Sequence, residues 1–229
     1  MIARSDTAAG TSFEPFRLTS AALQRVVRID TAPDNGVRTS TFSSREQAMQ
    51  RRRGEFALGR EIAAQLLAEL GSAETAVGVA EDRSPLWPAG FIGSITHTTT
   101  WCGVAVALRD EVRGIGIDIE RMVSEKDSAA VSAVCLNAAE RRLIASCADP
   151  LRAITICFAA KESLFKCLNP VTGTWFDFLE AEVTGLDMEG GNVALQLLRS
   201  LNAEFREGSV YAARCNVIDK HVFLSVELM

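Results

Sequence analysis

The stretch Gly114-Ile115-Gly116-Ile117-Asp118-Ile119-Glu120 alternates isoleucine with small or acidic residues without a break. Successive side chains of a β-strand point to opposite faces, so this alternation predicts a strand whose isoleucines face a core. The glycines and acids then share the other face. Asp118 and Glu120 would stand about 7 Å apart there, two strand rises of roughly 3.3 Å. We therefore expect a strand over residues 112–120 with one core face and one acidic face.

Two carboxylates at this spacing can share a hard cation such as Mg²⁺. Gly116 lies on the same face and is expected to leave an open space beside Asp118 for a ligand backbone or a phosphate. The alternative is a solvated acidic strand face with a glycine bulge. The two glycines do not form a dinucleotide-binding motif, because no third glycine and no helix follow them.

The flanking sequence predicts both helices and further antiparallel strands. Strands are expected over residues 91–95, 101–108, 175–183, 193–198, 210–217 and 222–228. Helices are expected over residues 45–70, over 137–147 with a capping box from Asn137 and Glu140, and over 151–168, ended by Asn169-Pro170. Each half of the chain thus has a helix followed by a strand pair, which indicates an α+β protein with a pseudo-duplicated organisation.

The last of these helices carries the segment Phe158-Ala159-Ala160-Lys161-Glu162-Ser163-Leu164-Phe165-Lys166. At 100° per residue, Lys161 falls inside the apolar arc and Glu162 just beyond its edge. A charge so placed needs a partner or a ligand. The alternative is an exposed Glu162–Lys166 pair one turn apart, worth about 0.3 to 0.5 kcal/mol.

A third segment, WPAGFIGSITHT over residues 87–98, brings a hydroxyl and an imidazole to the end of a strand. Thr96 and His97, beside freed backbone N–H groups, suit phosphate binding. The segment is not a GxSxG nucleophile motif, and no acid lies near it in sequence to complete a triad. The alternative is a histidine that is structural or merely exposed.

A fourth feature is a basic run in the first helix, which Ser43 or Ser44 would cap and which Gly54 weakens. The run consists of Arg45, Arg51, Arg52, Arg53 and Arg60. Arg52 and Arg60 lie eight residues apart and about 80° from each other around the helix, within reach of one polyanion. The planar guanidinium suits phosphate. A solvated helix face is the alternative.

Composition excludes several classes of protein. The chain has 229 residues, with 24 basic and 29 acidic side chains and a formal net charge of −5. No apolar run approaches the roughly 20 residues that span a bilayer, and an acidic chain without a basic tail argues against general nucleic-acid binding. Six cysteines without a CxxC pair, and a start without an apolar leader, predict reduced thiols in the cytoplasm. Two histidines exclude a His-rich zinc site, so any metal is expected to be held by oxygen.

Taken together and in this order, the basic helix, the WPAGFIGSITH segment, the GIGIDIE strand and the FAAKESLFK helix resemble the 4′-phosphopantetheinyl transferases of the Sfp/EntD type. The sequence WPAGFIGSITH is most similar to that of the EntD branch, which is associated with siderophore and other nonribosomal peptide synthesis. The match covers roughly residues 45–185. It implies two subdomains, each an antiparallel sheet packed with helices. Residues 1–115 would bind the phosphates of coenzyme A, residues 116–229 would carry the metal site, and the active site would lie between them.

The resemblance implies a role for each matching residue. Asp118, Glu120 and Glu162 match the acids that hold Mg²⁺ against the pyrophosphate of coenzyme A. Glu162 would also take the acceptor's proton, directly or through water, and Lys166 would contact the phosphate near the leaving group. The other implied contacts to coenzyme A are Thr96 and His97 at the nucleotide phosphates, Arg52, Arg60 and Arg83 as basic contacts, and Phe176 in the pantetheine channel.

The implied reaction moves the 4′-phosphopantetheine arm from coenzyme A to a serine of an apo peptidyl, aryl or acyl carrier protein, and releases adenosine 3′,5′-bisphosphate. The expected pathway is siderophore or other nonribosomal peptide synthesis, or polyketide synthesis. The carrier supplies the serine, which explains why this chain shows no nucleophile–base pair. We expect a cytoplasmic monomer whose partners are coenzyme A and carrier proteins. One alternative is a Mg²⁺ nuclease, against which the net charge speaks. The other is a non-catalytic coenzyme A-binding protein, against which the retention of all three acids and Lys166 speaks.

Overall fold

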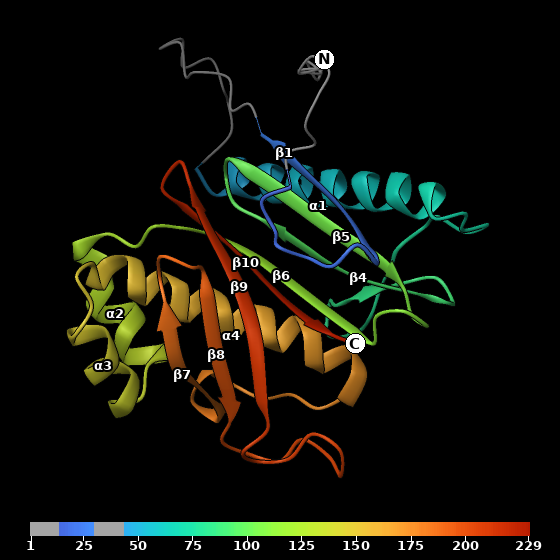
Figure 1. The fold of residues 1–229 in the computed structure, drawn as a ribbon. Coiled ribbons are helices and arrows are strands. Elements are labelled where there is room, and N and C mark those ends of the chain that lie inside the picture. The colour runs from blue at the N-terminus through green and yellow to red at the C-terminus, as the bar shows by residue number, and fades with distance from the viewer. Residues whose placement is uncertain (1–13, 30–43) are drawn as a thin grey trace.

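The computed structural model describes residues 14–29 and 44–229, and Figure 1 shows them as two main sheets flanked by helices. The first half contains β1 (Ala22–Arg28), α1 (Ser44–Glu69), β2 (Gly78–Val79), β3 (Pro85–Leu86), β4 (Phe91–His97) and β5 (Trp101–Leu108). The smaller main sheet has the antiparallel order β1-β5-β4, and β2 pairs separately with β3. α1 lies along this sheet and buries Ile62 and Leu66 in one cluster with Val104 and Val106 of β5.

The second half builds the larger sheet around a long helix. It contains β6 (Gly114–Arg121), α2 (Glu125–Cys135), α3 (Ala138–Ala145), α4 (Pro150–Thr172), a 3₁₀ turn η1 (Phe178–Glu180), β7 (Ala181–Asp187), β8 (Asn192–Leu197), β9 (Val210–Ile218) and β10 (His221–Leu228). The sheet order is β6-β10-β9-β8-β7, with every pair antiparallel. α4 packs against β6 and β10 (Figure 1). Within the described ranges, no helix has the length and apolarity that a membrane crossing needs.

The two sheets meet where β4 lies beside β6. Ser94 and Thr96 lie two residues apart on β4, so their hydroxyls point to the same face of the strand. Ser94 Oγ accepts a hydrogen bond from the Ile117 backbone N–H, and Thr96 Oγ1 accepts one from Ile119, both at 3.1 Å. We call these two side chains and the two N–H groups that they bind the hydroxyl seam. The seam satisfies backbone donors of β6 that would otherwise be buried without a partner.

The predicted core face of β6 is confirmed. Ile117 is buried in a cluster that also contains Phe16, Trp101 and Phe223, and these residues come from both halves of the chain. The predicted boundary at residue 115 therefore falls inside a strand whose apolar face packs against the first half. As a division into separate subdomains, 1–115 and 116–229, it stays a prediction.

The predicted α+β fold with an antiparallel sheet in each half is confirmed. The capping box at the start of α3 is present, with Asn137 Oδ1 accepting from the Ala139 and Glu140 N–H groups and Glu140 accepting from the Asn137 N–H. Strands β4, β5, β6, β8, β9 and β10 lie within a few residues of their predicted positions. The elements that were not predicted are β1, α2, the short strands β2 and β3, and η1. Ser43, one of the two predicted caps of α1, lies outside the described residues.

Two predicted boundaries are wrong for local reasons. α4 continues past Pro170 to Thr172, because a proline in the last turn loses only one backbone hydrogen bond. Gly173 ends the helix in the left-handed conformation, with φ of 63°, and donates its N–H to the Asn169 carbonyl. The strand predicted from Trp175 begins only at Ala181, because Asp177 and Glu180 form a capping box that folds η1 instead.

The open space predicted beside Gly116 is filled by α4. A Cβ added at Gly116 would overlap the Ser163 carbonyl oxygen and lie 2.7 Å from the Cys167 nitrogen, and one at Gly114 would lie 2.8 Å from the Cys167 carbonyl oxygen. No ligand can enter there, so this prediction is wrong. The glycines instead let the helix backbone rest directly on β6. That close approach brings Glu162 and Lys166, one helical turn apart, to the acidic end of the strand.

Replacing Gly116 with alanine is therefore expected to lower the free energy of unfolding by about 1 to 3 kcal/mol, the usual cost of overpacking a close contact. Gly54 is the matched control, since a Cβ there meets nothing within 4 Å. Gly54→Ala is expected to raise the free energy of unfolding by about 0.5 to 1 kcal/mol, through better helix propensity. Urea denaturation of both variants measures the difference. A Gly116→Ala protein as stable as the parent would contradict the helix-contact role.

Candidate functional site

The centre of the candidate site is Asp118, a buried acid on β6 that is 3% exposed. Its Oδ1 accepts hydrogen bonds from Lys166 Nζ at 2.6 Å and from Thr96 Oγ1 at 3.0 Å. Its Oδ2 is buried and has no hydrogen-bond partner within residues 14–29 and 44–229. The three residues come from β6, α4 and β4, so this contact joins both halves of the chain.

Lys166 is the cation of the site. Its Nζ also lies 3.4 Å from the Ile117 carbonyl oxygen, and its side chain is 27% exposed. Burial alone would lower the pKa of Lys166, but Asp118, then Glu162 and Glu120, outweigh burial and raise the pKa above its usual value. The ammonium group therefore stays protonated at neutral pH.

Glu120 and Glu162 complete the predicted acid set. Burial, and then repulsion from Asp118, raise the pKa of Glu120 to about 8, against the attraction of Lys166. Burial also raises the pKa of Glu162, where Lys166 again opposes the shift and Asp118 adds to it. One lysine thus faces three carboxyl groups. The site holds more negative charge than its own residues compensate, which disfavours ionisation of the two glutamates.

The raised pKa of Glu120, caused by burial and then by the charge of Asp118, predicts a pH dependence for the metal-free protein in a chelator. Glu120 releases its proton near its ordinary pKa of 4.5 when unfolded but near 8 when folded, so the unfolded state binds fewer protons between these values. The contribution of Glu120 to the free energy of unfolding is therefore fully present below pH 4.5, and it is lost as the pH rises through 8. Each pKa unit corresponds to about 1.4 kcal/mol, so the difference between these two pKa values limits the loss to at most about 5 kcal/mol.

Urea denaturation of the parent and of Glu120→Gln between pH 5.5 and 8.5 isolates this effect. The variant cannot ionise at position 120, so its advantage in the free energy of unfolding should grow with pH. Parallel stability curves for the two proteins would show that Glu120 titrates near its ordinary pKa.

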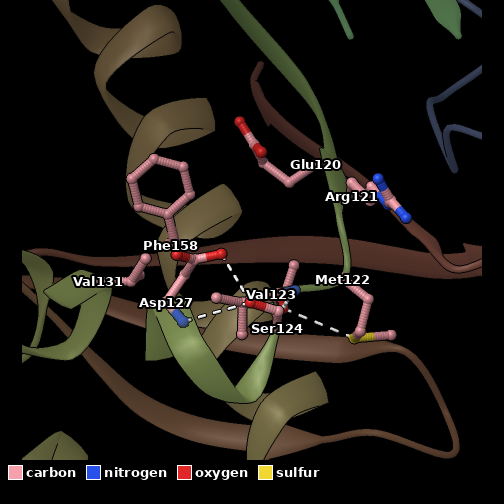
Figure 2. A pocket seen from close by; sticks show the side chains of 9 residues that line it. Glu120, Arg121, Met122, Val123, Ser124, Asp127, Val131 and Phe158 are labelled. Carbon is pink, nitrogen blue, oxygen red and sulfur yellow. Dashed lines mark hydrogen bonds between the residues drawn. The ribbon is translucent and has the colours of Figure 1, made fainter. Parts of the chain in front are cut away.

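A cavity of about 380 Å³ opens beside Glu120. Figure 2 shows Glu120 at its upper edge, with Phe158 of α4 on one side and Ser124 hydrogen-bonded to Asp127 at the start of α2 below. The lining residues are Glu120, Arg121, Met122, Val123, Ser124, Asp127, Val131, Thr155 and Phe158. The lining combines apolar side chains with polar and charged ones, which suits a ligand that has both an apolar stretch and a polar end.

Lys161 has the partner that its position in the apolar arc requires, and this prediction is confirmed. Its Nζ contacts Glu140 Oε2 at 2.8 Å, the Cys135 carbonyl oxygen at 2.7 Å and the Phe178 carbonyl oxygen at 2.8 Å. Phe178 stacks on Phe158, with ring centroids 5.2 Å apart. Lys161 therefore binds the backbone of Phe178, whose ring packs on the cavity-lining Phe158, and Lys161 itself does not line the cavity.

His97 ends β4 next to α1. Its Nδ1 lies 3.5 Å from an oxygen of Glu55, a largely buried acid of α1, and about two fifths of its side chain is exposed. Thr96 faces the opposite way and is buried. Sequence reasoning missed Glu55, Glu140 and Ser94. Of these three, only Glu140 had a recognisable sequence signal, because it was predicted as the capping residue of α3.

The remaining predicted residues lie apart from the acids. Arg52 and Arg83 are exposed, on α1 and in the turn before β3. Arg60 stacks over Phe56 at 4.6 Å and donates to the Gly78 carbonyl oxygen at 3.3 Å. Phe176 is buried against Phe165, at 5.3 Å between ring centroids. Within the described part of the chain no hydrogen bond or ion pair joins these residues to Asp118, so their roles stay predictions.

The acid cluster has the chemistry of a divalent-cation site. Within the described residues Asp118 Oδ2 is a buried acceptor without a donor, and burial, together with the charge of Asp118, raises the pKa values of Glu120 and Glu162. Oxygen ligands of this kind are those that Mg²⁺ prefers. Across residues 14–29 and 44–229, no three His, Cys, Asp or Glu side chains are already gathered as a metal centre. The residues therefore fit the ion in type and charge, and its binding is left as a proposal.

Two family models match the chain. The 4′-phosphopantetheinyl transferase N-terminal domain matches residues 42–107, and the 4′-phosphopantetheinyl transferase superfamily matches residues 114–215. A crystal structure of Thermotoga maritima holo-[acyl-carrier-protein] synthase matches 51% of this chain and 63% of that one, with 21% identity and a TM-score of 0.39.

Characterised relatives agree with the family models. Enterobactin synthase component D of Salmonella typhimurium is 34% identical over 164 residues, 71% of this chain and 67% of that protein. The 4′-phosphopantetheinyl transferase Npt of Nocardia iowensis is 34% identical over 146 residues, 64% of each chain. This chain thus spans about two thirds of the length of these relatives. The matches do not support the nuclease or the non-catalytic alternative. This chain belongs to the 4′-phosphopantetheinyl transferase superfamily.

Proposed function

We propose that this protein transfers the 4′-phosphopantetheine arm of coenzyme A to a serine of an apo carrier protein and releases adenosine 3′,5′-bisphosphate. The observation that carries this proposal is the contact between Lys166 and Asp118 at the junction of the two halves, where the charges of Glu120 and Glu162 also act on Lys166. Family membership supports the same reaction.

Lys166 supplies positive charge to the leaving group. Asp118 orients its ammonium group at 2.6 Å and raises its pKa, so Nζ keeps its proton while a phosphate leaves. A fixed cation beside developing phosphate charge lowers the barrier without rearranging during the reaction. More than a quarter of the side chain is exposed, which leaves room for that contact.

Glu162 is the proposed base. The pKa of Glu162 is raised towards neutral pH, and a general base takes a hydroxyl proton most effectively when its pKa lies near the working pH. The acceptor serine belongs to the carrier, and the cavity beside Glu120 offers a route for its side chain. Asp118, Glu120 and Glu162 would hold Mg²⁺, which when bound neutralises charge on the pyrophosphate.

The predicted coenzyme A contacts remain part of the proposal. Arg52, Arg60 and Arg83 would bind nucleotide phosphates together with His97, and Phe176 would border the pantetheine arm. Arginine suits this use because its planar fork binds phosphate oxygens in pairs. A cytoplasmic monomer likewise stays a prediction.

The proposed carriers are those of nonribosomal peptide and siderophore synthesis, since several relatives are named enterobactin synthase component D. The test incubates the purified protein with Mg²⁺, coenzyme A and apo peptidyl, aryl or acyl carrier domains. Mass spectrometry should show a carrier heavier by one phosphopantetheine group, and a serine-to-alanine carrier should stay unchanged. Absence of this gain with all three carrier types would refute the proposal.

A further inference from the structure

We propose that Thr96 positions Asp118, holding one oxygen of that carboxylate so that the other faces the metal. This inference rests on the metal-binding part of the proposed function. It gives Thr96 a role that differs from the phosphate contact implied by the sequence.

The hydrogen bonds of Thr96 are already assigned within the protein. A threonine hydroxyl has one proton and two lone pairs. Oγ1 gives its proton to Asp118 Oδ1 at 3.0 Å and accepts the Ile119 N–H at 3.1 Å. The side chain is 4% exposed. With its proton held by Asp118, the hydroxyl does not donate to a phosphate in this arrangement.

The two donors on Asp118 act on the same oxygen. Thr96 and Lys166 both bind Oδ1, while Oδ2 is buried and has no hydrogen-bond partner among the residues that the structure describes. An ordinary surface acid would share its donors between both oxygens or turn to water. Fixing one oxygen from outside is how proteins orient carboxylate ligands, and removing such a partner typically weakens metal affinity about 10- to 100-fold.

Ser94 provides a control within the same seam. It lies on the same face of β4, is equally buried and accepts the Ile117 N–H at 3.1 Å. It makes no hydrogen bond to a carboxylate in the described part of the chain. Ser94→Ala and Thr96→Val therefore each remove one seam hydrogen bond, but only Thr96→Val also removes a hydrogen bond to Asp118.

The test measures Mn²⁺ binding by electron paramagnetic resonance, with Mn²⁺ replacing Mg²⁺ and without a carrier protein. Thr96→Val should raise the dissociation constant for Mn²⁺ about 10- to 100-fold. Thr96→Ser keeps the hydroxyl and should bind Mn²⁺ like the parent, as should Ser94→Ala. Circular dichroism checks that each variant is folded, and Thr96→Ala replaces Thr96→Val if the latter does not fold.

Parent-like affinity in the folded variant that lacks the hydroxyl would overturn the proposal. So would equal weakening in Ser94→Ala, because the effect would then belong to the seam as a whole. A parent that binds no Mn²⁺ would also overturn it. Because no transfer step is measured, a failure of carrier modification would leave these comparisons intact.

Discussion

Replacing Lys161 with methionine is expected to lower the free energy of unfolding by about 3 to 5 kcal/mol, the usual cost of breaking a buried ion pair. The side chains of Lys161 and Glu140 are 1% and 0% exposed. The variant leaves the Glu140 carboxylate without its cation in the core, and it also leaves the Cys135 and Phe178 carbonyls without this donor. Chemical denaturation at pH 7 measures the loss.

A surface pair supplies the matched control. Arg113 and Glu204 lie 2.7 Å apart with about half of each side chain exposed, so Arg113→Met should change the free energy of unfolding far less than Lys161→Met does. In a Lys161→Met/Glu140→Gln double variant the stranded charge is absent, and part of the lost stability should return. If Lys161→Met were as mild as Arg113→Met, the pair would be hydrated in solution and not buried.

Lys161 also shows how much of its environment could be predicted from the sequence. Helical periodicity places its charge in the apolar arc and so indicates that a partner exists. The partner itself depends on how α3 packs on α4, which no local pattern contains. Glu140 was visible only as a capping residue, yet its Oε2 accepts both the Asn137 N–H and Lys161 Nζ. One carboxylate therefore serves a local and a tertiary role, and only the local one has a sequence signature.

β6 shows the same difference between local structure, which the sequence pattern predicts, and tertiary packing, which it does not. Strict alternation assigns both faces of β6 correctly, because the period of a strand is a property of its backbone. It does not say what occupies the space above a glycine, and here α4 occupies it. β1 was missed because ALQRVVR does not alternate strictly, and its strand conformation depends on pairing with β5. The residues of the site were thus predictable from motifs, whereas the seam that joins them was not.

Replacing Glu162 with glutamine is expected to reduce the rate of carrier modification by about 10²- to 10⁴-fold, the usual contribution of a positioned general base. The amide keeps the shape of the side chain but can neither take the serine proton nor supply a negative metal ligand. Quantitative mass spectrometry of the carrier under single-turnover conditions measures the rate. Glu189→Gln, in the exposed turn between β7 and β8, is the control and should keep the parent rate.

The stability of Glu162→Gln distinguishes a functional acid from a structural one. Burial and the Asp118 charge raise the pKa of Glu162, so its ionised form destabilises the metal-free fold above that pKa. Removing the charge should leave the free energy of unfolding in a chelator at pH 8 unchanged or raise it. A structural acid would show a loss of stability together with the loss of activity. Full activity in this variant would reject Glu162 as base and metal ligand, whereas lost activity in a protein at least as stable as the parent is the signature of an acid retained for chemistry.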